Sequence, residues 1–242
     1  MRCVTAKFVP HLLTAEQKDN RVSICTASVS EPKIYPNFMS SIITGDKCWV
    51  NGYDPETKQM SSQWNMASSP QPKKAQHVKS NVKTMLIASF NIDGLVHHEY
   101  IPRGQAVNKE FYKTFLQCLR DAVRRHHTEK WRSSNWILHH DNAPAHMAVA
   151  TNEFLAKHNI LSLSHPRYFP DLALCDLLLF SQLKKTMKDH QFDYVEEIHA
   201  NAMRLLRAIM RSDYQRCFCQ WQEHWNKCIQ AQGHHFEGDK TN

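Results

Sequence analysis

Two β-rich runs joined by a tight turn constrain the fold of this chain more than any other feature. Residues 82–90 and 95–101 are rich in β-forming side chains, and Asn91-Ile92-Asp93-Gly94 lies between them. An Asp-Gly pair between two such runs is a strong signal for a β-hairpin. Further strand candidates precede the hairpin, at residues 42–44 and 49–50 and in the short run Ser62-Gln63-Trp64. The folded part of the chain is therefore predicted to begin with antiparallel strands.

Beyond the hairpin the hydrophobic pattern becomes helical. Phe111, Phe115, Leu119 and Val123 recur at four-residue intervals, which predicts a helix over residues 107–127. Further strands are expected at residues 135–140 and 160–164, and further helices at residues 145–158, 172–187, 194–210 and 212–230. Strands followed by alternating helices and strands predict an α/β fold in which helices flank a central mixed β-sheet.

The N-terminal residues 1–36 show no clear hydrophobic period and contain Pro10, Pro32 and Pro36. This pattern predicts an extended arm, with a short helical piece over residues 14–22. We divide the chain into this arm (1–36), one domain (37–232) and a C-terminal tail (233–242).

Composition describes an ordinary globular chain with a basic surplus. The 242 residues are 42% hydrophobic and 22% charged, and the net charge of +7 fits a polyanionic partner such as nucleic acid. The eight cysteines are scattered, and neither a signal peptide nor a membrane-spanning run is present in the sequence. We therefore expect an intracellular protein with reduced thiols and no membrane partner.

Three aspartates form a candidate metal site. Asp141 closes the apolar strand candidate at 135–140, 34 residues separate it from Asp176, and Asp46 follows Gly45 in a strand region. Mg²⁺ and Mn²⁺ prefer carboxylate oxygens, and two such ions support in-line displacement at phosphorus. The pattern indicates metal-dependent phosphoryl transfer on nucleic acid.

Each aspartate also has a purely structural interpretation. Asp176 shares a helical face with Leu172, Leu179, Phe180 and Leu183, where a buried Arg or Lys would balance its charge as well as a metal would. Asp141 is equally placed to cap the following helix, and Asp46 to form a turn. Asp171 follows Pro170 at a helix start, so we interpret it as a cap and leave it out of the site.

Two zinc sites are weaker alternatives. His139, His140 and His146 surround Asp141, but neighbouring strand residues point to opposite faces and cannot share one ion. A second set comprises Cys217, Cys219, His224 and Cys228, which lacks the ligand spacing of known zinc fingers. Trp221 and Trp225, four residues apart on a helix, are interpreted as core anchors.

Over residues 4–239 the sequence resembles the catalytic part of mariner-type transposases. The motifs that carry the resemblance are Ile43-Thr44-Gly45-Asp46, Ser62-Gln63-Trp64, His139-His140-Asp141-Asn142-Ala143-Pro144-Ala145-His146, and the segment 165–176. Phe8-Val9-Pro10-His11-Leu12-Leu13 resembles the linker motif of the family, which usually has Trp where Phe8 stands. The 34-residue interval between the second and third aspartates is typical of the family.

The resemblance implies an RNase H-like fold and two Mg²⁺ or Mn²⁺ ions held by Asp46, Asp141 and Asp176. It also implies cleavage and strand transfer of double-stranded DNA by a nuclear homodimer that uses no small-molecule cofactor. Family members carry two helix-turn-helix domains ahead of the linker, and the chain begins at the linker, so we expect it to lack specific binding of inverted repeats.

The motif also departs from the family. Lys47 replaces an acidic residue, Arg167 a proline, Phe169 a serine, Leu174 a proline and Asp189 a glycine. A non-catalytic DNA-binding module, or a domesticated or relic transposase, is therefore the alternative interpretation.

Overall fold

A five-stranded mixed sheet lies at the centre of the computed structural model, which describes residues 9, 11–53, 64–66, 69–70, 80–132, 136–163, 165–166, 169–188 and 190–236. The strand order is β3-β2-β1-β4-β5. The β1/β2 and β2/β3 pairs are antiparallel, whereas β1/β4 and β4/β5 are parallel. In chain order the strands are β1 (Ile42–Asn51), β2 (Lys83–Asn91), β3 (Gly94–Ile101), β4 (Ile137–His139) and β5 (Leu161–Leu163). The mixed sheet confirms the predicted fold class.

The predicted hairpin is present as β2 and β3. The side-chain oxygen of Asn91 accepts hydrogen bonds from the backbone N–H groups of Asp93 (2.9 Å) and Gly94 (3.0 Å). Gly94 has a φ of 146°, a conformation that side chains with a Cβ rarely adopt. The hydrogen bonds of Asn91 and the backbone conformation of Gly94 therefore close the turn without help from the rest of the protein. This local origin explains why the hairpin could be predicted from the sequence.

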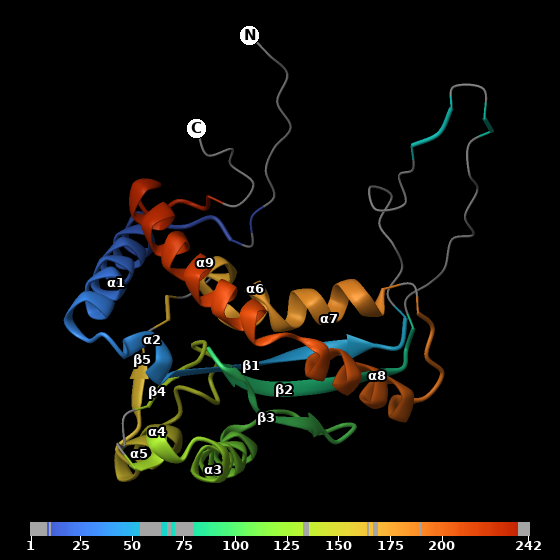
Figure 1. Cartoon of the computed structure of the whole chain (residues 1–242), viewed down its shortest axis with the longest axis horizontal. Helices are drawn as coiled ribbons and strands as arrows, with labels where there is room; N and C mark the ends of the chain where they lie inside the picture. Colours follow the sequence, from blue (N-terminus) through green and yellow to red (C-terminus); the bar gives the residue numbers. More distant parts are fainter. Residues whose placement is uncertain are drawn as a thin grey trace.

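Helices cover both faces of the sheet (Figure 1). The α-helices are α1 (Ala15–Ile34), α2 (Phe38–Ser41), α3 (Lys109–His126), α4 (Thr128–Arg132), α5 (Val149–Lys157), α6 (Leu174–Leu177), α7 (Leu179–Met187), α8 (Val195–Ala208) and α9 (Arg211–Gln230), and a 3₁₀ helix, η1, spans Pro170–Leu172. Successive side chains of β1 point to opposite faces of the sheet and pack in two different hydrophobic cores. Ile42 packs in the core formed with α6 to α9, and Ile43 packs in the core formed with α3 and α5. None of the described helices is long and apolar enough to cross a membrane.

The N-terminal arm differs from its prediction, because α1 is a helix of 20 residues that packs along α9. A capping box formed by Thr14 and Gln17 starts the helix. Its buried positions are Arg21, Cys25 and Ser28. These residues have helical spacing but are polar or small, so a search for apolar periodicity could not find this helix.

The predicted helix over residues 172–187 is interrupted. Leu178 has φ −122° and ψ −73°, and it separates α6 from α7, while η1 precedes α6. Leu172, Leu179, Phe180 and Leu183 are buried as expected. The β4 strand and the α5 helix are shorter than predicted. Of the strand candidate Ser62-Gln63-Trp64, the first two residues lie outside the described residues, and Trp64 is exposed in a segment without regular structure.

Candidate active site

The three predicted site aspartates line one cleft of about 530 Å³. Asp46 lies within β1, Asp141 lies two residues after the end of β4, and Asp176 lies in α6. Thr44 of β1 pairs in parallel register with His139 of β4, so the two aspartates each stand two residues beyond a paired position. The parallel pairing therefore brings Asp46 and Asp141 to the same place on neighbouring strands, and α6 adds the third carboxylate.

Negative charge in this cleft is incompletely balanced. Burial, followed by the charge of Asp141, raises the pKa of Asp46 to about 7, although Lys47 opposes the shift. Burial also raises the pKa of Asp176, and Asp141 adds to this effect while Lys184 opposes it. Asp46 and Asp176 are hard oxygen donors whose ionisation is disfavoured in this way, so the cleft fits divalent cations, which would favour the ionised carboxylates.

The carboxylates do not converge on a single point. Within the described parts of the chain, only His97, Glu99 and Cys118 form a set of three His, Cys, Asp or Glu ligand atoms that lie within 4.8 Å of each other. The aspartate oxygens are thus more widely spaced than these atoms. A site for two ions about 4 Å apart does not require all three carboxylates to reach one ion.

Asp141 is held in place by His146, which lies five residues later in the chain. Nδ1 of His146 lies 2.5 Å from Oδ1 of Asp141, and the backbone N–H of Ala143 donates to the same oxygen at 3.1 Å. Burial raises the pKa of Asp141, but the hydrogen bond and charge of His146 overcome this and hold the pKa well below its usual range. The carboxylate is therefore fixed and ionised.

The remaining histidines of the motif orient this turn. Both ring nitrogens of His140 are engaged: Nδ1 lies 2.8 Å from the Tyr112 hydroxyl and Nε2 lies 3.0 Å from Oγ of Ser162. His139 pairs instead with Thr44 Oγ1 (3.0 Å) and with His165 Nδ1 (3.2 Å). The two rings have different partners, as the strand geometry predicted, and they support no shared zinc ion.

Sequence reasoning placed Asp171 wrongly. Its carboxylate caps no helix; it is fully buried and lies 3.8 Å from Nη2 of Arg21, which is 1% exposed. The buried Arg–Asp pair that the sequence suggested as a structural role for Asp176 thus exists at Asp171. Because η1 leads directly into α6, this pair anchors the segment that carries Asp176.

The second zinc alternative does not form. Cys217 and Cys228 are buried on α9 and Cys219 is exposed. Trp221 and Trp225 are buried, and the indole N–H of Trp221 donates to the carbonyl of Leu172 at 2.8 Å, so both act as core residues.

Two features escaped the sequence reasoning. His146 was interpreted as a packing or capping residue or as a metal ligand, and not as a partner of Asp141. Its position five residues after Asp141, across a turn containing Pro144, allows it to face back toward the carboxylate. The His97–Glu99–Cys118 group was missed entirely. Its signal is the alternate spacing of His97 and Glu99 on one strand face, which becomes informative only when the packing of α3 is known.

Two sequence comparisons identify relatives of this chain. A family model described as "Transposase (partial DDE domain)" matches residues 54–133, which lie between Asp46 and Asp141. The mariner Mos1 transposase of Drosophila mauritiana is 30% identical over 232 residues, which cover 96% of this chain and 66% of that protein. The histone-lysine N-methyltransferase SETMAR of Homo sapiens is 26% identical over 96% of this chain and 33% of its own length.

Solved structures show the same similarity. The mariner Mos1 paired-end complex with Mn has a TM-score of 0.87 at 29% identity, covering 98% of this chain and 68% of that chain. The catalytic domain of Mos1 has a TM-score of 0.77 at 28% identity, and the match covers 95% of this chain and all of that domain. The fold is accordingly the RNase H-like fold of that domain. The chain belongs to the mariner-type transposases and corresponds to their catalytic domain.

Proposed function

We propose that this chain cleaves DNA strands and joins the resulting 3′ ends to target DNA, with Asp46, Asp141 and Asp176 as the catalytic, metal-binding residues. The observation that carries the proposal is that these three aspartates, from β1, from the turn after β4 and from α6, line one cleft. The raised pKa of Asp46, caused by burial and by Asp141, supports it, because a cleft of this kind gains from bound cations.

The metal is Mg²⁺ or Mn²⁺, and the site holds two ions. Solved Mos1 structures that resemble this chain contain Mn or Mg. Bound ions of this class activate the attacking oxygen and stabilise the leaving oxygen at phosphorus. The protein's part is to hold its oxygen donors rigid: His146 and Ala143 fix Asp141, and the β1 ladder fixes Asp46.

Double-stranded DNA is the proposed substrate, bound by a homodimer in the nucleus. The structural neighbours include Mos1 complexes described as a pre-cleavage transpososome and a strand transfer complex. The net charge of +7 is consistent with contacts to phosphates. The chain spans about two thirds of the Mos1 transposase. We propose that residues 37–232 supply the chemistry without specific recognition of inverted repeats.

The test is nicking of supercoiled plasmid by the purified chain with Mg²⁺ or Mn²⁺, alongside Asp141→Ala and the near-isosteric Asp141→Asn. Both variants should lose nicking and keep their fold and general affinity for DNA. Asp193→Ala, at an exposed position outside the cleft, is the matched control and should nick like the wild type.

Equal nicking by both Asp141 variants would reject the site assignment. A folded wild-type chain that binds DNA without cleaving it, and whose binding weakens steeply with salt and ignores metal, would instead identify a binding module of transposase origin.

A further inference from the structure

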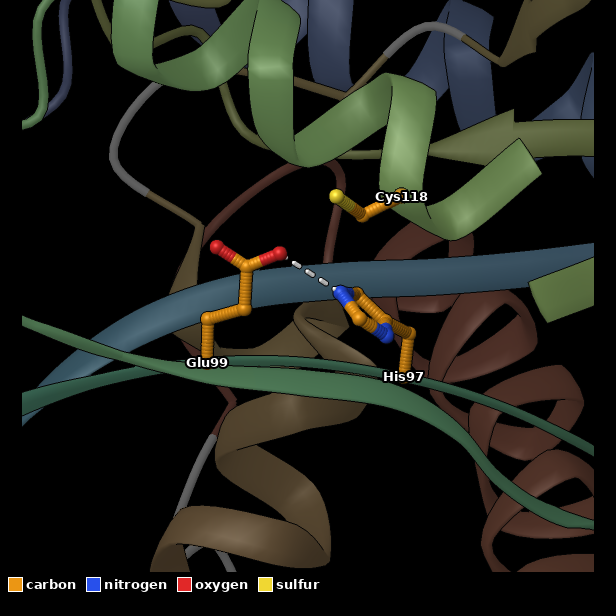
Figure 2. Close-up of side chains that lie close together, drawn as sticks. All are labelled: His97, Glu99 and Cys118. Atoms are coloured by element: carbon orange, nitrogen blue, oxygen red, sulfur yellow. Dashed lines mark hydrogen bonds and ion pairs between the residues drawn. The ribbon is translucent and has the colours of Figure 1, made fainter. Parts of the chain in front are cut away.

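A second cluster of metal-ligating side chains lies on the edge strand of the sheet. His97 and Glu99 are two residues apart on β3, so they project from the same face of the strand, and α3 covers this face with Cys118. Figure 2 shows the imidazole and the carboxylate rising from the strand toward the Cys118 sulfur above them. Nitrogen, oxygen and sulfur donors from two elements therefore face one another.

The geometry of this group is tight. Its three ligand atoms lie within 4.8 Å of each other, and Nε2 of His97 is 2.7 Å from Oε1 of Glu99. The His97 ring packs against Phe115, with centroids 5.3 Å apart, so its orientation is fixed by the core. The His97 and Glu99 side chains are 20% and 27% exposed, which leaves an ion a path from solvent.

The donor types select the metal. Imidazole nitrogen, thiolate sulfur and a carboxylate oxygen suit Zn²⁺ and its probe Co²⁺, whereas Mg²⁺ prefers oxygen ligands alone. A thiolate and a carboxylate also neutralise a divalent ion. We propose that His97, Glu99 and Cys118 form a zinc-class metal site with solvent as the fourth ligand, separate from the aspartate cleft.

Binding needs only small movements. Zinc bond lengths of about 2.0–2.3 Å in tetrahedral geometry place ligand atoms roughly 3.3–3.6 Å apart. The His97–Glu99 pair therefore opens slightly: Nε2 of His97 gives up the proton of the hydrogen bond to solvent while Nδ1 takes one up, so that Nε2 and a Glu99 oxygen each bond the metal. Cys118 releases its thiol proton to solvent when the sulfur–metal bond forms.

The site joins two elements whose apolar side chains share one core cluster. A bound ion would tie edge strand β3 to α3, and α3 carries Tyr112, whose hydroxyl pairs with His140 next to Asp141. Metal at this site therefore stabilises the helix that supports the turn carrying Asp141, without contacting the three aspartates.

Titration with Co²⁺ of protein freed of metal by chelation tests the proposal. The wild type should bind one Co²⁺ through sulfur, with thiolate-to-metal charge-transfer absorption and the visible bands of tetrahedral cobalt, whatever further Co²⁺ the aspartate cleft takes up. Cys118→Ser and Glu99→Gln should each lose these signals or weaken binding at least tenfold. Cys219→Ser removes an exposed cysteine on α9 and should leave the spectrum unchanged. Asp141→Asn should also leave it unchanged, because the two sites are separate.

The wild type offers a readout that needs no variant. Micromolar Zn²⁺ should slow alkylation of Cys118 relative to Cys219, as peptide mass spectrometry would show. Absence of a thiolate band in the folded wild type would overturn the proposal, as would a band that survives both Cys118→Ser and Glu99→Gln. Alkylation of Cys118 at the same rate with and without Zn²⁺ would overturn it as well.

Discussion

The buried pair between Arg21 and Asp171 makes the sharpest stability prediction. Arg21 comes from α1 and Asp171 from η1, and both side chains are 1% exposed. Within the described residues neither carboxylate oxygen of Asp171 has a hydrogen-bond partner. The guanidinium, which also lies over the ring of Phe169 at 3.0 Å, therefore supplies the principal compensation for this buried charge.

The magnitude follows from the separation and the burial. At 3.8 Å the attraction between unit charges is about 4 kcal/mol for an effective dielectric constant of about 20. Desolvation of the two ions offsets most of this, so the intact pair contributes little net free energy. Removing only Arg21 leaves the carboxylate uncompensated, which typically costs about 3–5 kcal/mol. We expect the lower end, about 3 kcal/mol, because Nδ1 of His235 lies 3.9 Å from the same carboxylate.

Urea unfolding of Arg21→Met, followed by tryptophan fluorescence, measures this loss. Trp221 is a suitable reporter because its indole donates to the carbonyl of Leu172 in η1. The double variant Arg21→Met/Asp171→Leu should recover more than half of the lost free energy of unfolding, since it removes both charges. The matched control is Arg216→Met, which breaks a shorter pair (2.6 Å to Asp213) whose arginine is 65% exposed.

The exposure of each arginine should affect the loss of unfolding free energy more than the distance between the paired atoms does. We expect Arg216→Met to lose less than 1 kcal/mol, because exposed ion pairs are weak. A loss below 1 kcal/mol for Arg21→Met, or a double variant no more stable than the single one, would refute the reasoning that burial of an unpaired charge governs the effect.

Two further predictions concern the turn after β4 that carries Asp141, and the histidines around it. Burial lowers the pKa values of His140 and His165 to about 4, so the folded protein leaves them neutral while the unfolded chain protonates them near pH 6.5. The free energy of unfolding should therefore fall as the pH drops from 6.5 to 4, by at most about 3 kcal/mol for each histidine. Urea unfolding at pH 5 and 7.5 measures this change. The control variant His190→Gln, at an exposed position, should show the same dependence of the free energy of unfolding on pH. Equal stability of the wild type at both pH values would contradict the prediction. His146→Gln removes the 2.5 Å partner of Asp141, and Mn²⁺ affinity should fall about 10- to 100-fold by calorimetric titration; unchanged affinity would show that His146 does not orient the carboxylate.

The parts of the fold that sequence could predict are those where local chemistry and burial agree. The β2–β3 hairpin was predictable because Asn91 and Gly94 build their own turn, and α3 because Phe115 and Leu119 form an apolar stripe. The three aspartates were found through the family resemblance and from their positions in a strand region, at a strand end and on an apolar helix face. The structure brings them to one cleft, while their roles in catalysis and metal binding remain predictions.

The parts that sequence could not predict depend on long-range polar contacts. The α1 helix buries Arg21 and Cys25 rather than an apolar stripe, so its helical period is visible only when α9 and η1 are in place. Asp171 was misjudged for the same reason, because its partner lies 150 residues earlier in the chain.

These polar contacts place the N-terminal helix close to the aspartate cleft, although the sequence analysis assigned it to a separate arm. Arg21 of α1 pairs with Asp171 of η1, and η1 is followed at once by α6 with Asp176. Another part of α1, including Gln17 and Asn20, lines a second cleft together with His140 and His165. The α1 helix thus contacts the segment that carries Asp176 at one point and borders the turn that carries Asp141 at another. A change in the position of α1 can therefore move both aspartates. The packing of α1 should therefore affect the proposed catalysis as well as stability.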